Sequence, residues 1–287
     1  MTDPAGDIER RLGVACAAAR DGGVQVARRY GETDHEMKAP GSPVTEADLA
    51  ANAAVIATIQ ASFPGEPILS EESRDDRARL SHDAVWIVDP LDGTKEFLAR
   101  NGEFAVMVGY ARVGEAVLGA VYLPAVDMLY WGAPGYGAWV QRGQALAEPL
   151  VSAAANGSLR MVGSRSHHDP LLVRIQTALG VEDIEPAGSV GVKCARIAEA
   201  RRDLYIHPVP YLSEWDTCAP EALVRGAGGS VVDCLGERLR YNKPEPKQPH
   251  GILACGAGVL GRVLDRVRSI YQESRITQTS GRRSQEG

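Results

Sequence analysis

The sequence lacks the features that mark a secreted, membrane-spanning or redox-active protein. Its five cysteines are scattered and form no CxxC pair, which argues against a disulfide framework, a zinc ribbon or a thiol redox motif. No run of about 18 apolar residues could span a bilayer. The charged first residues, MTDPAGDIERR, contain no apolar signal-peptide core. We therefore expect a protein of the reducing cytoplasm with no membrane partner.

An excess of positive charge is also missing. Lys and Arg number 31 against 37 Asp and Glu, which gives a net charge of −6. This balance argues against a broad surface for a nucleic-acid polymer, and a phosphorylated ligand would need a local device such as bound metal ions. Walker A, HExxH, EF-hand and GxSxG motifs are absent. The sequence GAGVLG at 256–261 spells GxGxxG, but too few residues follow it to complete a dinucleotide-binding unit, so we expect only a strand-to-helix turn.

The first half of the sequence contains two helical patterns followed by a strand pattern. Apolar residues at helical spacing predict one helix over 7–30. A second helix is expected to open at Thr45, where Asp48 forms a variant of the capping box. The composition of 38–43 predicts a loop between them. Five short segments between 67 and 132, rich in β-branched and aromatic residues, then predict a mostly antiparallel sheet.

In the second half, strand-like and helical segments alternate. Strands are expected at 159–163, 203–207, 229–233 and 251–255, and helices from Asp169, over 192–200, from about Asp216 and around 260–271. Helices that cover sheets in both halves predict an α/β (α+β) protein built as a layered αβαβα sandwich. We expect a largely antiparallel N-terminal α+β domain over 1–150, a mixed C-terminal α/β domain over 151–272 and a disordered tail at 273–287, where the sequence is polar and aperiodic.

The densest chemistry lies in WIVDPLDGTKEF, residues 86–97. Its apolar run is typical of a buried strand that ends at Asp89, and Pro90, which has no N–H, is expected to stop the ladder. Asp92 follows three residues after Asp89 and begins a tight turn. Two carboxylates and the intervening carbonyl of Leu91 are the oxygen ligands that Mg²⁺ prefers.

The turn itself suggests an anion site. Thr94 can cap the helix that follows, and the exposed N–H groups of Gly93 and Thr94 suit a phosphate oxygen. The same letters would also fit an ordinary solvated Asp-Gly turn, and the motif alone leaves that alternative open.

Two further acids stand at element ends. Glu71 follows the apolar strand 67–70, and Asp216 stands where a helix begins, next to Trp215, which would pack there and exclude water. Taken singly, Glu71 could be a surface acid and Asp216 a helix N-cap. Together with Asp89 and Asp92 they form the pattern of a multi-metal carboxylate site.

These motifs carry a resemblance to a known family. DPLDGT preceded by WIV, with SEES upstream and EWDTCAPE downstream, resembles the inositol monophosphatase superfamily of Mg²⁺-dependent, lithium-sensitive phosphatases. The longer string DPLDGTKEFLARNGEFAV, with GSRSHHD and WDTCAPE, is more similar to the 3′(2′),5′-bisphosphate nucleotidase branch. The resemblance covers about Lys38 to Gly256, most of the chain.

The resemblance implies a metal centre and a water-orienting pair. The implied ligands of two or three Mg²⁺ ions, for which Mn²⁺ could substitute, lie mostly in the N-terminal half: Glu71, Asp89, the carbonyl of Leu91, Asp92 and Asp216. Thr94 and Glu71 would orient the attacking water, and Asp48 would hydrogen-bond Thr94. Asp48 also has its capping-box interpretation, and we expect the two to be compatible only if its carboxylate leaves the helix terminus.

The resemblance also implies contacts to the substrate. The loop GSRSHHD would supply Ser164, Arg165 and Ser166, although its histidines could equally be a solvated surface pair. In GSVGVK, Lys193 would meet a phosphate, or would be an exposed lysine without a function. His207 stands where several relatives carry arginine, and it would offer a weaker, pH-dependent contact to a second phosphate, which leaves the nucleotide preference open.

The implied activity is that of a Mg²⁺-dependent phosphomonoesterase. It would remove the 3′-phosphate of 3′-phosphoadenosine 5′-phosphate, and of the corresponding 5′-phosphosulfate in sulfur assimilation, by direct attack of water without a covalent enzyme–phosphate. The alternative within the class is an inositol monophosphatase or another small sugar-phosphate phosphatase. A catalytically silent module that binds an anionic nucleotide or metal is the alternative outside it. The only other partner that the resemblance suggests is a second copy in a homodimer.

Overall fold

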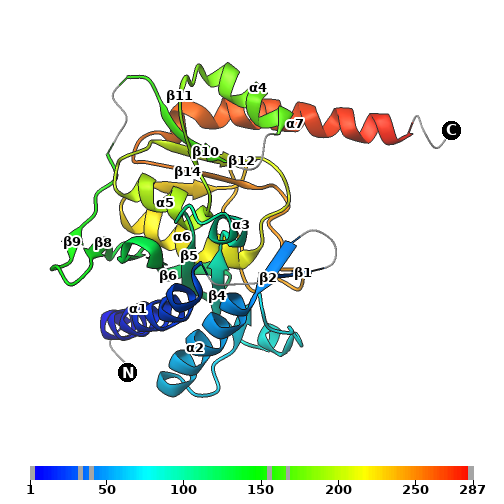
Figure 1. Ribbon diagram of the computed structural model, residues 1–287. Coiled ribbons are helices and arrows are strands. Elements are labelled where there is room, and N and C mark those ends of the chain that lie inside the picture. Colours follow the sequence, from blue (N-terminus) through cyan, green and yellow to red (C-terminus); the bar gives the residue numbers. More distant parts are fainter. Residues whose placement is uncertain (1–3, 32–34, 39–41, 154–156, 166–168, 284–287) are drawn as a thin grey trace.

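The chain folds into five layers of helix, sheet, helix, sheet and helix (Figure 1). The computed structural model describes residues 4–31, 35–38, 42–153, 157–165 and 169–283. Three clusters of buried side chains fill the spaces between the layers. This arrangement confirms the predicted αβαβα sandwich. In the described part of the chain, no helix is long and apolar enough to cross a bilayer.

The first layer consists of α1 (Pro4–Arg29) and α2 (Glu46–Ser62), which cover the outer face of the first sheet. They are joined through an antiparallel hairpin of β1 (His35–Lys38) and β2 (Ser42–Thr45). The expectation of a loop over 38–43 is therefore wrong for the ends of that range, where Lys38 pairs with Ser42. A two-stranded ladder has an open edge on each strand, so the nitrogen of Pro43 needs no partner.

The first sheet has seven strands that lie side by side in chain order. Only its first two strands pair in parallel, and all later pairs are antiparallel, as the sequence predicted. The last two strands, beyond residue 133, were not predicted. The strands, with the short helical segments between them, are β3 (Ile68–Ser70), η1 (Ala78–Ser81), β4 (Ala84–Asp92), α3 (Thr94–Leu98), β5 (Ala105–Arg112), β6 (Glu115–Leu123), η2 (Pro124–Val126), β7 (Met128–Ala133), β8 (Gly137–Arg142) and β9 (Glu148–Pro149).

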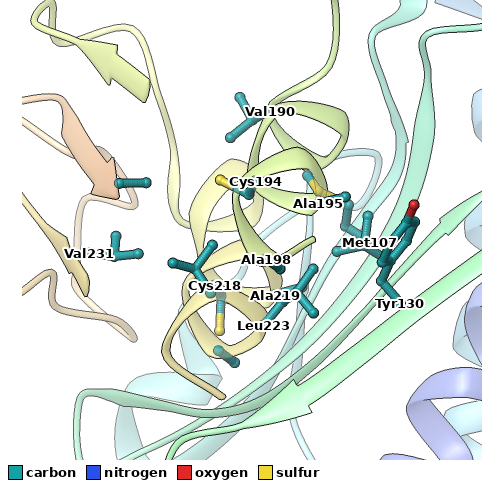
Figure 2. Close-up of a cluster of buried hydrophobic side chains, with 14 of the residues drawn as sticks. Met107, Tyr130, Val190, Cys194, Ala195, Ala198, Cys218, Ala219, Leu223 and Val231 are labelled. Atoms are coloured by element: carbon teal, nitrogen blue, oxygen red, sulfur yellow. The ribbon is translucent and has the colours of Figure 1, made fainter. Parts of the chain in front are cut away.

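The middle layer is made of α5 (Val190–Ala198) and α6 (Glu214–Gly226). Figure 2 shows small and medium-sized side chains of both helices, such as Cys194 and Ala219, packed between the two sheets. On the first sheet, α6 lies directly against the backbone. A Cβ added to Gly119 of β6 would lie 2.5 Å from the Cα of Ala219, and one added to Gly109 of β5 would lie 2.7 Å from Cys218 Sγ. Glycine at these two positions therefore lets α6 approach β5 and β6 without a side chain from the sheet between them.

The second sheet is mixed, as predicted, and its outer face is covered by two helices. β10 pairs in parallel with both of its neighbours, whereas β14 is antiparallel to both of its own. The turn at 256–259 joins a strand to a helix, as expected for the GAGVLG segment. The strands in spatial order are β11 (Asp183–Ala187), β10 (Arg160–Ser164), β12 (Leu204–His207), β14 (Ile252–Cys255) and β13 (Ser230–Val232), and the covering helices are α4 (Pro170–Leu179) and α7 (Leu260–Arg283).

The last helix corrects one boundary of the sequence analysis. A disordered tail was expected over 273–287, but α7 continues to Arg283 and extends beyond the rest of the molecule (Figure 1). Residues 272–283 contain no proline, so the helical hydrogen bonds can continue after Tyr271, which is buried. The boundary near residue 150 stays a prediction. The chain leaves the first sheet at β9 and enters the second at β10.

Candidate active site

Strand β4 continues beyond the proline that was expected to end it. Asp89 is opposite Met107 and Asp92 is opposite Ala105, with a shift of register between the two pairs. This irregularity accommodates Pro90, which cannot donate a ladder hydrogen bond. The N–H of Leu91 instead donates to Asp89 Oδ1 at 3.0 Å. Both acids of the DPLDGT motif therefore belong to one strand.

Gly93 makes the turn from β4 into α3. Its φ is +95°, in the left-handed region. An added Cβ would lie 3.1 Å from the carbonyl oxygen of Glu103. Both backbone conformation and space therefore favour glycine here. Gly93 and Thr94 both line the pocket in front of the strand end.

Four acids that are remote in sequence meet in this pocket. Asp89, Asp92 and Asp216 each offer one carboxylate oxygen, and these oxygens lie within 4.8 Å of one another. Glu71, directly after β3, lines the same pocket and repels the carboxylates of Asp89 and Asp216. The structure therefore brings together the acids on which the sequence analysis depended.

Asp216 is held by the start of α6, although not as its N-cap. Ser213 is the N-cap, and Asp216 is the third residue of the helix. Its Oδ2 accepts a hydrogen bond from the N–H of Ser213 and so closes a capping box. The interpretation of Asp216 as a simple N-cap is therefore wrong. The cap occupies one carboxylate oxygen and fixes the direction of the other.

Burial and mutual repulsion disfavour the charged form of these acids in the absence of a cation. Burial raises the pKa of Asp89 well above its usual range, and the charges of Glu71, Asp92 and Asp216 raise it further. Burial and Glu71 likewise raise the pKa of Asp216. Crowded carboxylate oxygens fit a hard divalent cation such as Mg²⁺.

The pKa of Asp92 is raised less strongly because its carboxylate has donors. Burial raises it, but hydrogen bonds from Ser189 Oγ and from the N–H of Gly191, at 2.8 Å, oppose the effect, as does the charge of Lys193. These donors belong to the start of α5. No sequence motif indicated this link, which attaches Asp92 to the middle layer.

We expect the stability of the metal-free protein to fall with rising pH because of this cluster. An acid with a raised pKa in the folded state binds more protons when folded than when unfolded, so stability decreases as the pH rises from about 4 through the raised pKa values of Asp89 and Asp216. Asp89→Asn removes one of these charges. Its urea midpoint in EDTA should therefore fall less than that of the wild type between pH 4 and pH 7. Parallel pH profiles for the two proteins would show that the repulsion is absent.

Asp48 performs both of the tasks that the sequence suggested for it. Its Oδ2 accepts hydrogen bonds from the N–H of Thr45 at 2.8 Å and from Thr45 Oγ1 at 2.6 Å, within the capping box of α2. Its Oδ1 lies 3.3 Å from Thr94 Oγ1, which donates to it. The expectation that the two tasks are compatible only if the carboxylate leaves the helix terminus is wrong, because the carboxylate uses one oxygen for each task while it stays there.

The predicted substrate residues are only partly in the pocket, whose volume is about 420 Å³. Arg165 is not among the lining residues, and its guanidinium pairs with Glu103 at 3.0 Å. Ser166, like the two histidines that follow it, lies outside the described residues. The predicted substrate residues that line the pocket are Gly93, Thr94, Ser164, Lys193 and His207.

Lys193 is not the exposed lysine that one interpretation allowed. The residue is 3% exposed, its ammonium group donates to the carbonyl of Gly188, and Nζ lies 5.2 Å from the ring centroid of Tyr205. Burial lowers its pKa, and the charge of Asp92 opposes this effect. Lys193 is therefore a buried cation next to the acid cluster.

Several pocket residues were missed because no motif gives them a role, and Tyr211 and Lys247 are two of them. Tyr211 and Lys247 both line the pocket. Lys247 comes from the segment before β14, and a β-bridge pairs it with Ser213, just before α6. Trp215, by contrast, lines the pocket and packs against the middle-layer core, as expected.

Comparison with known proteins gives consistent similarities over most of the chain. A model of the inositol monophosphatase family matches residues 7–267. The 3′(2′),5′-bisphosphate nucleotidase CysQ of Shigella flexneri is 35% identical over 238 residues, which are 82% of this chain and 95% of that protein. A 3′-phosphoadenosine 5′-phosphate phosphatase of Mycobacterium bovis is 33% identical over 223 residues, 76% of this chain and 80% of that protein. The crystal structure of CysQ from Bacteroides thetaiotaomicron, a bacterial member of the inositol monophosphatase family, matches with a TM-score of 0.74 and 34% identity over 85% of this chain and 97% of that one.

Proposed function

Since the chain belongs to the inositol monophosphatase family of phosphatases, which confirms the resemblance carried by DPLDGT and EWDTCAPE, we propose that it removes the 3′-phosphate of 3′-phosphoadenosine 5′-phosphate with the help of bound Mg²⁺. The observation that carries this proposal is the convergence of Asp89, Asp92 and Asp216, whose oxygens lie within 4.8 Å of one another in a pocket. The sulfated analogue, 3′-phosphoadenosine 5′-phosphosulfate, is proposed as a second substrate.

The acid cluster is the proposed metal centre. Its donors are all oxygen atoms, which favours Mg²⁺, with Mn²⁺ as a substitute. When bound, such ions offset the charge of the phosphoryl group and make a water molecule more acidic. The proposed ligands are Glu71, Asp89, the carbonyl oxygen of Leu91, Asp92 and Asp216.

Thr94 is the proposed orienting group for the attacking water. Its hydroxyl has one hydrogen, and both acceptors near it, Asp48 Oδ1 and the carbonyl of Leu91, lie at 3.3 Å. With that hydrogen donated, a lone pair of Oγ1 can accept a hydrogen bond from water. The cap of α2 holds Asp48 in place, so this acceptor for the Thr94 hydroxyl is positioned before substrate binds. Glu71 is the proposed second partner of the water.

The phosphoryl group is proposed to lie against the turn after β4. There the N–H groups of Gly93 and Thr94 would hold its equatorial oxygens and stabilise the charge that develops on them. The acids of the cluster are committed to metal, so direct attack by water is favoured over a covalent enzyme–phosphate. Ser164, Lys193 and His207 line the same pocket and are the proposed contacts to the rest of the substrate.

The substrate proposal rests on the relatives and on the size of the site. The Shigella flexneri protein is named a bisphosphate nucleotidase, and the Mycobacterium bovis protein is named a 3′-phosphoadenosine 5′-phosphate phosphatase. A volume of about 420 Å³ falls in the range of roughly 300–1,000 Å³ that is typical of small-ligand pockets. Buried Lys193 adds a positive charge beside the acids.

A panel of phosphomonoesters tests this function. With Mg²⁺ present, we expect kcat/KM for 3′-phosphoadenosine 5′-phosphate to exceed that for inositol 1-phosphate by at least about tenfold, because charged contacts to a second phosphate are worth about that much. Phosphate release is measured for each compound, with Li⁺ and with EDTA in parallel samples. A preference for inositol 1-phosphate would overturn the substrate assignment, and undiminished hydrolysis in EDTA would overturn the metal assignment.

A further inference from the structure

Two residues outside every sequence motif form one edge of the pocket, which we call the rim. Tyr211 lies in the segment between β12 and α6, and Lys247 lies in the segment between β13 and β14. Tyr211 is 73% exposed and Lys247 is also exposed, although both line the pocket. A single exposed aromatic residue is ordinary on a protein surface. At the mouth of a ligand pocket, its free ring is available for stacking.

The charge of Lys247 is not neutralised by an ion pair. Its Nζ donates to Ser213 Oγ at 2.9 Å and lies 5.9 Å from the ring centroid of Trp215. In the chain as far as the structure describes it, no carboxylate lies within 4 Å of that ammonium group. An ammonium group has three hydrogens, and one bond to a neutral hydroxyl leaves two of them for an anion.

Lys247 stands beside the acid cluster but outside it. Ser213 connects the two, because its N–H donates to Asp216 and its Oγ accepts from Lys247. The same ammonium group is close enough to lower the pKa of Asp216 in part. A ligand whose first phosphate sits at the cluster can therefore reach Lys247 with a second anionic group on the same sugar.

The other two lysines of the pocket are placed differently. The ammonium group of Lys193 is buried and donates to Gly188. Lys95 is exposed and lies on the short helix α3, which directly follows the end of β4 that carries Asp89 and Asp92. Lys247 is thus the lysine that combines exposure, proximity to Asp216 and an aromatic neighbour.

We propose that the rim determines substrate specificity: Lys247 binds the non-scissile phosphate of the nucleotide and Tyr211 stacks on its base. This inference rests on the proposed function and assigns residues to the two parts of the substrate that are not cut. Base stacking on an aromatic side chain tolerates any base, so the rim selects nucleotides that carry a second phosphate rather than one particular base.

The Lys247 assignment is tested with two nucleotides that share a base and a 3′-phosphate. Lys247→Met should lower kcat/KM for adenosine 3′,5′-bisphosphate by about tenfold, mainly through KM, while the loss for adenosine 3′-phosphate stays below about twofold. Lys95→Met is the matched control, since it removes the same charge from the same pocket, and it should leave the ratio of the two substrates unchanged. Equal losses on both nucleotides, or no loss on either, would overturn the assignment.

The Tyr211 assignment is tested with inhibitors of the same reaction. Tyr211→Ala should weaken competitive inhibition by adenosine 5′-phosphate about tenfold and leave inhibition by inorganic phosphate unchanged. Tyr211→Phe, which keeps the ring, should be inhibited by adenosine 5′-phosphate as strongly as the wild type. Equal weakening of both inhibitors, or none, would show that the ring does not bind the base. If the wild type cleaves inositol 1-phosphate but neither nucleotide, the proposed function itself fails and the rim assignment fails with it. If the wild type cleaves the nucleotides but the Lys247 and Tyr211 variants show no selective loss, only the assignment of the rim is refuted.

Discussion

Asp89→Asn will abolish metal-dependent phosphate release and lower kcat/KM by at least about a thousandfold. Asp89 is 1% exposed and feels the charges of three other acids, so it is central to the proposed metal centre. An amide oxygen lacks the negative charge that holds a divalent cation, and the cation offsets the charge of the phosphoryl group. Loss of this electrostatic stabilisation is among the largest single effects in catalysis.

The fold of the Asp89→Asn variant should survive. Asn retains the Oδ1 atom that accepts from the N–H of Leu91, and the substitution relieves the repulsion that raises the pKa of Asp89. Phosphate release, Mg²⁺ binding by calorimetry and circular dichroism are measured together. Asp265→Asn, at a side chain that is 97% exposed on α7, is the matched control and should behave as the wild type. Near-normal turnover by Asp89→Asn would remove the basis of the metal assignment.

Thr94→Val is expected to lower kcat by about a hundredfold with little change in KM. Valine has nearly the shape of threonine but no hydroxyl, so the hydrogen bonds to Asp48 and to the carbonyl of Leu91 disappear. The attacking water then loses its orienting acceptor, and misplacement of a reacting group by about 1 Å can cost about a hundredfold in rate. The substrate contacts remain, which is why KM should change little.

Thr94→Ser provides the control because it keeps the hydroxyl. Its kcat should stay within about fivefold of the wild type, and single-turnover measurements will show whether the chemical step carries the difference. If the kcat of Thr94→Val equals that of Thr94→Ser, the hydroxyl has no part in orienting water. A large rise in KM in both variants would instead assign Thr94 to substrate binding alone.

The layer order and the convergence of the acids could be predicted from the sequence. The helical periodicity over 7–30, the capping box at Thr45 and the strand patterns over 84–123 can be recognised locally, and acids that follow apolar strands lie at the edge of a sheet. The resemblance of DPLDGT and EWDTCAPE to one family then predicted that these distant segments form one site. These signals are local or carried by motifs, which is why they can be read from one sequence.

Other features depend on partners that a linear pattern does not contain. Pro90 reads as a strand terminator, yet the ladder resumes at Asp92 because β5 offers a second register. Ser189 gives no sign that it would hold Asp92. Lys247 lies at the pocket because a β-bridge and backbone hydrogen bonds attach its segment to residues 212–214. Each of these contacts joins segments that are far apart in sequence, and their geometry is set by the packed layers.

The close approach of α6 to Gly109 and Gly119 has a consequence for the choice of ion. No side chain of the sheet at these two positions separates α6, which carries Asp216, from the strands beside Asp89 and Asp92, so the close packing of α6 limits how far Asp216 can move from the other two acids. Mg²⁺ demands short, nearly ideal octahedral distances, whereas Ca²⁺ tolerates a wider and looser shell. We therefore expect this restricted spacing to favour Mg²⁺ over Ca²⁺ at the proposed metal centre.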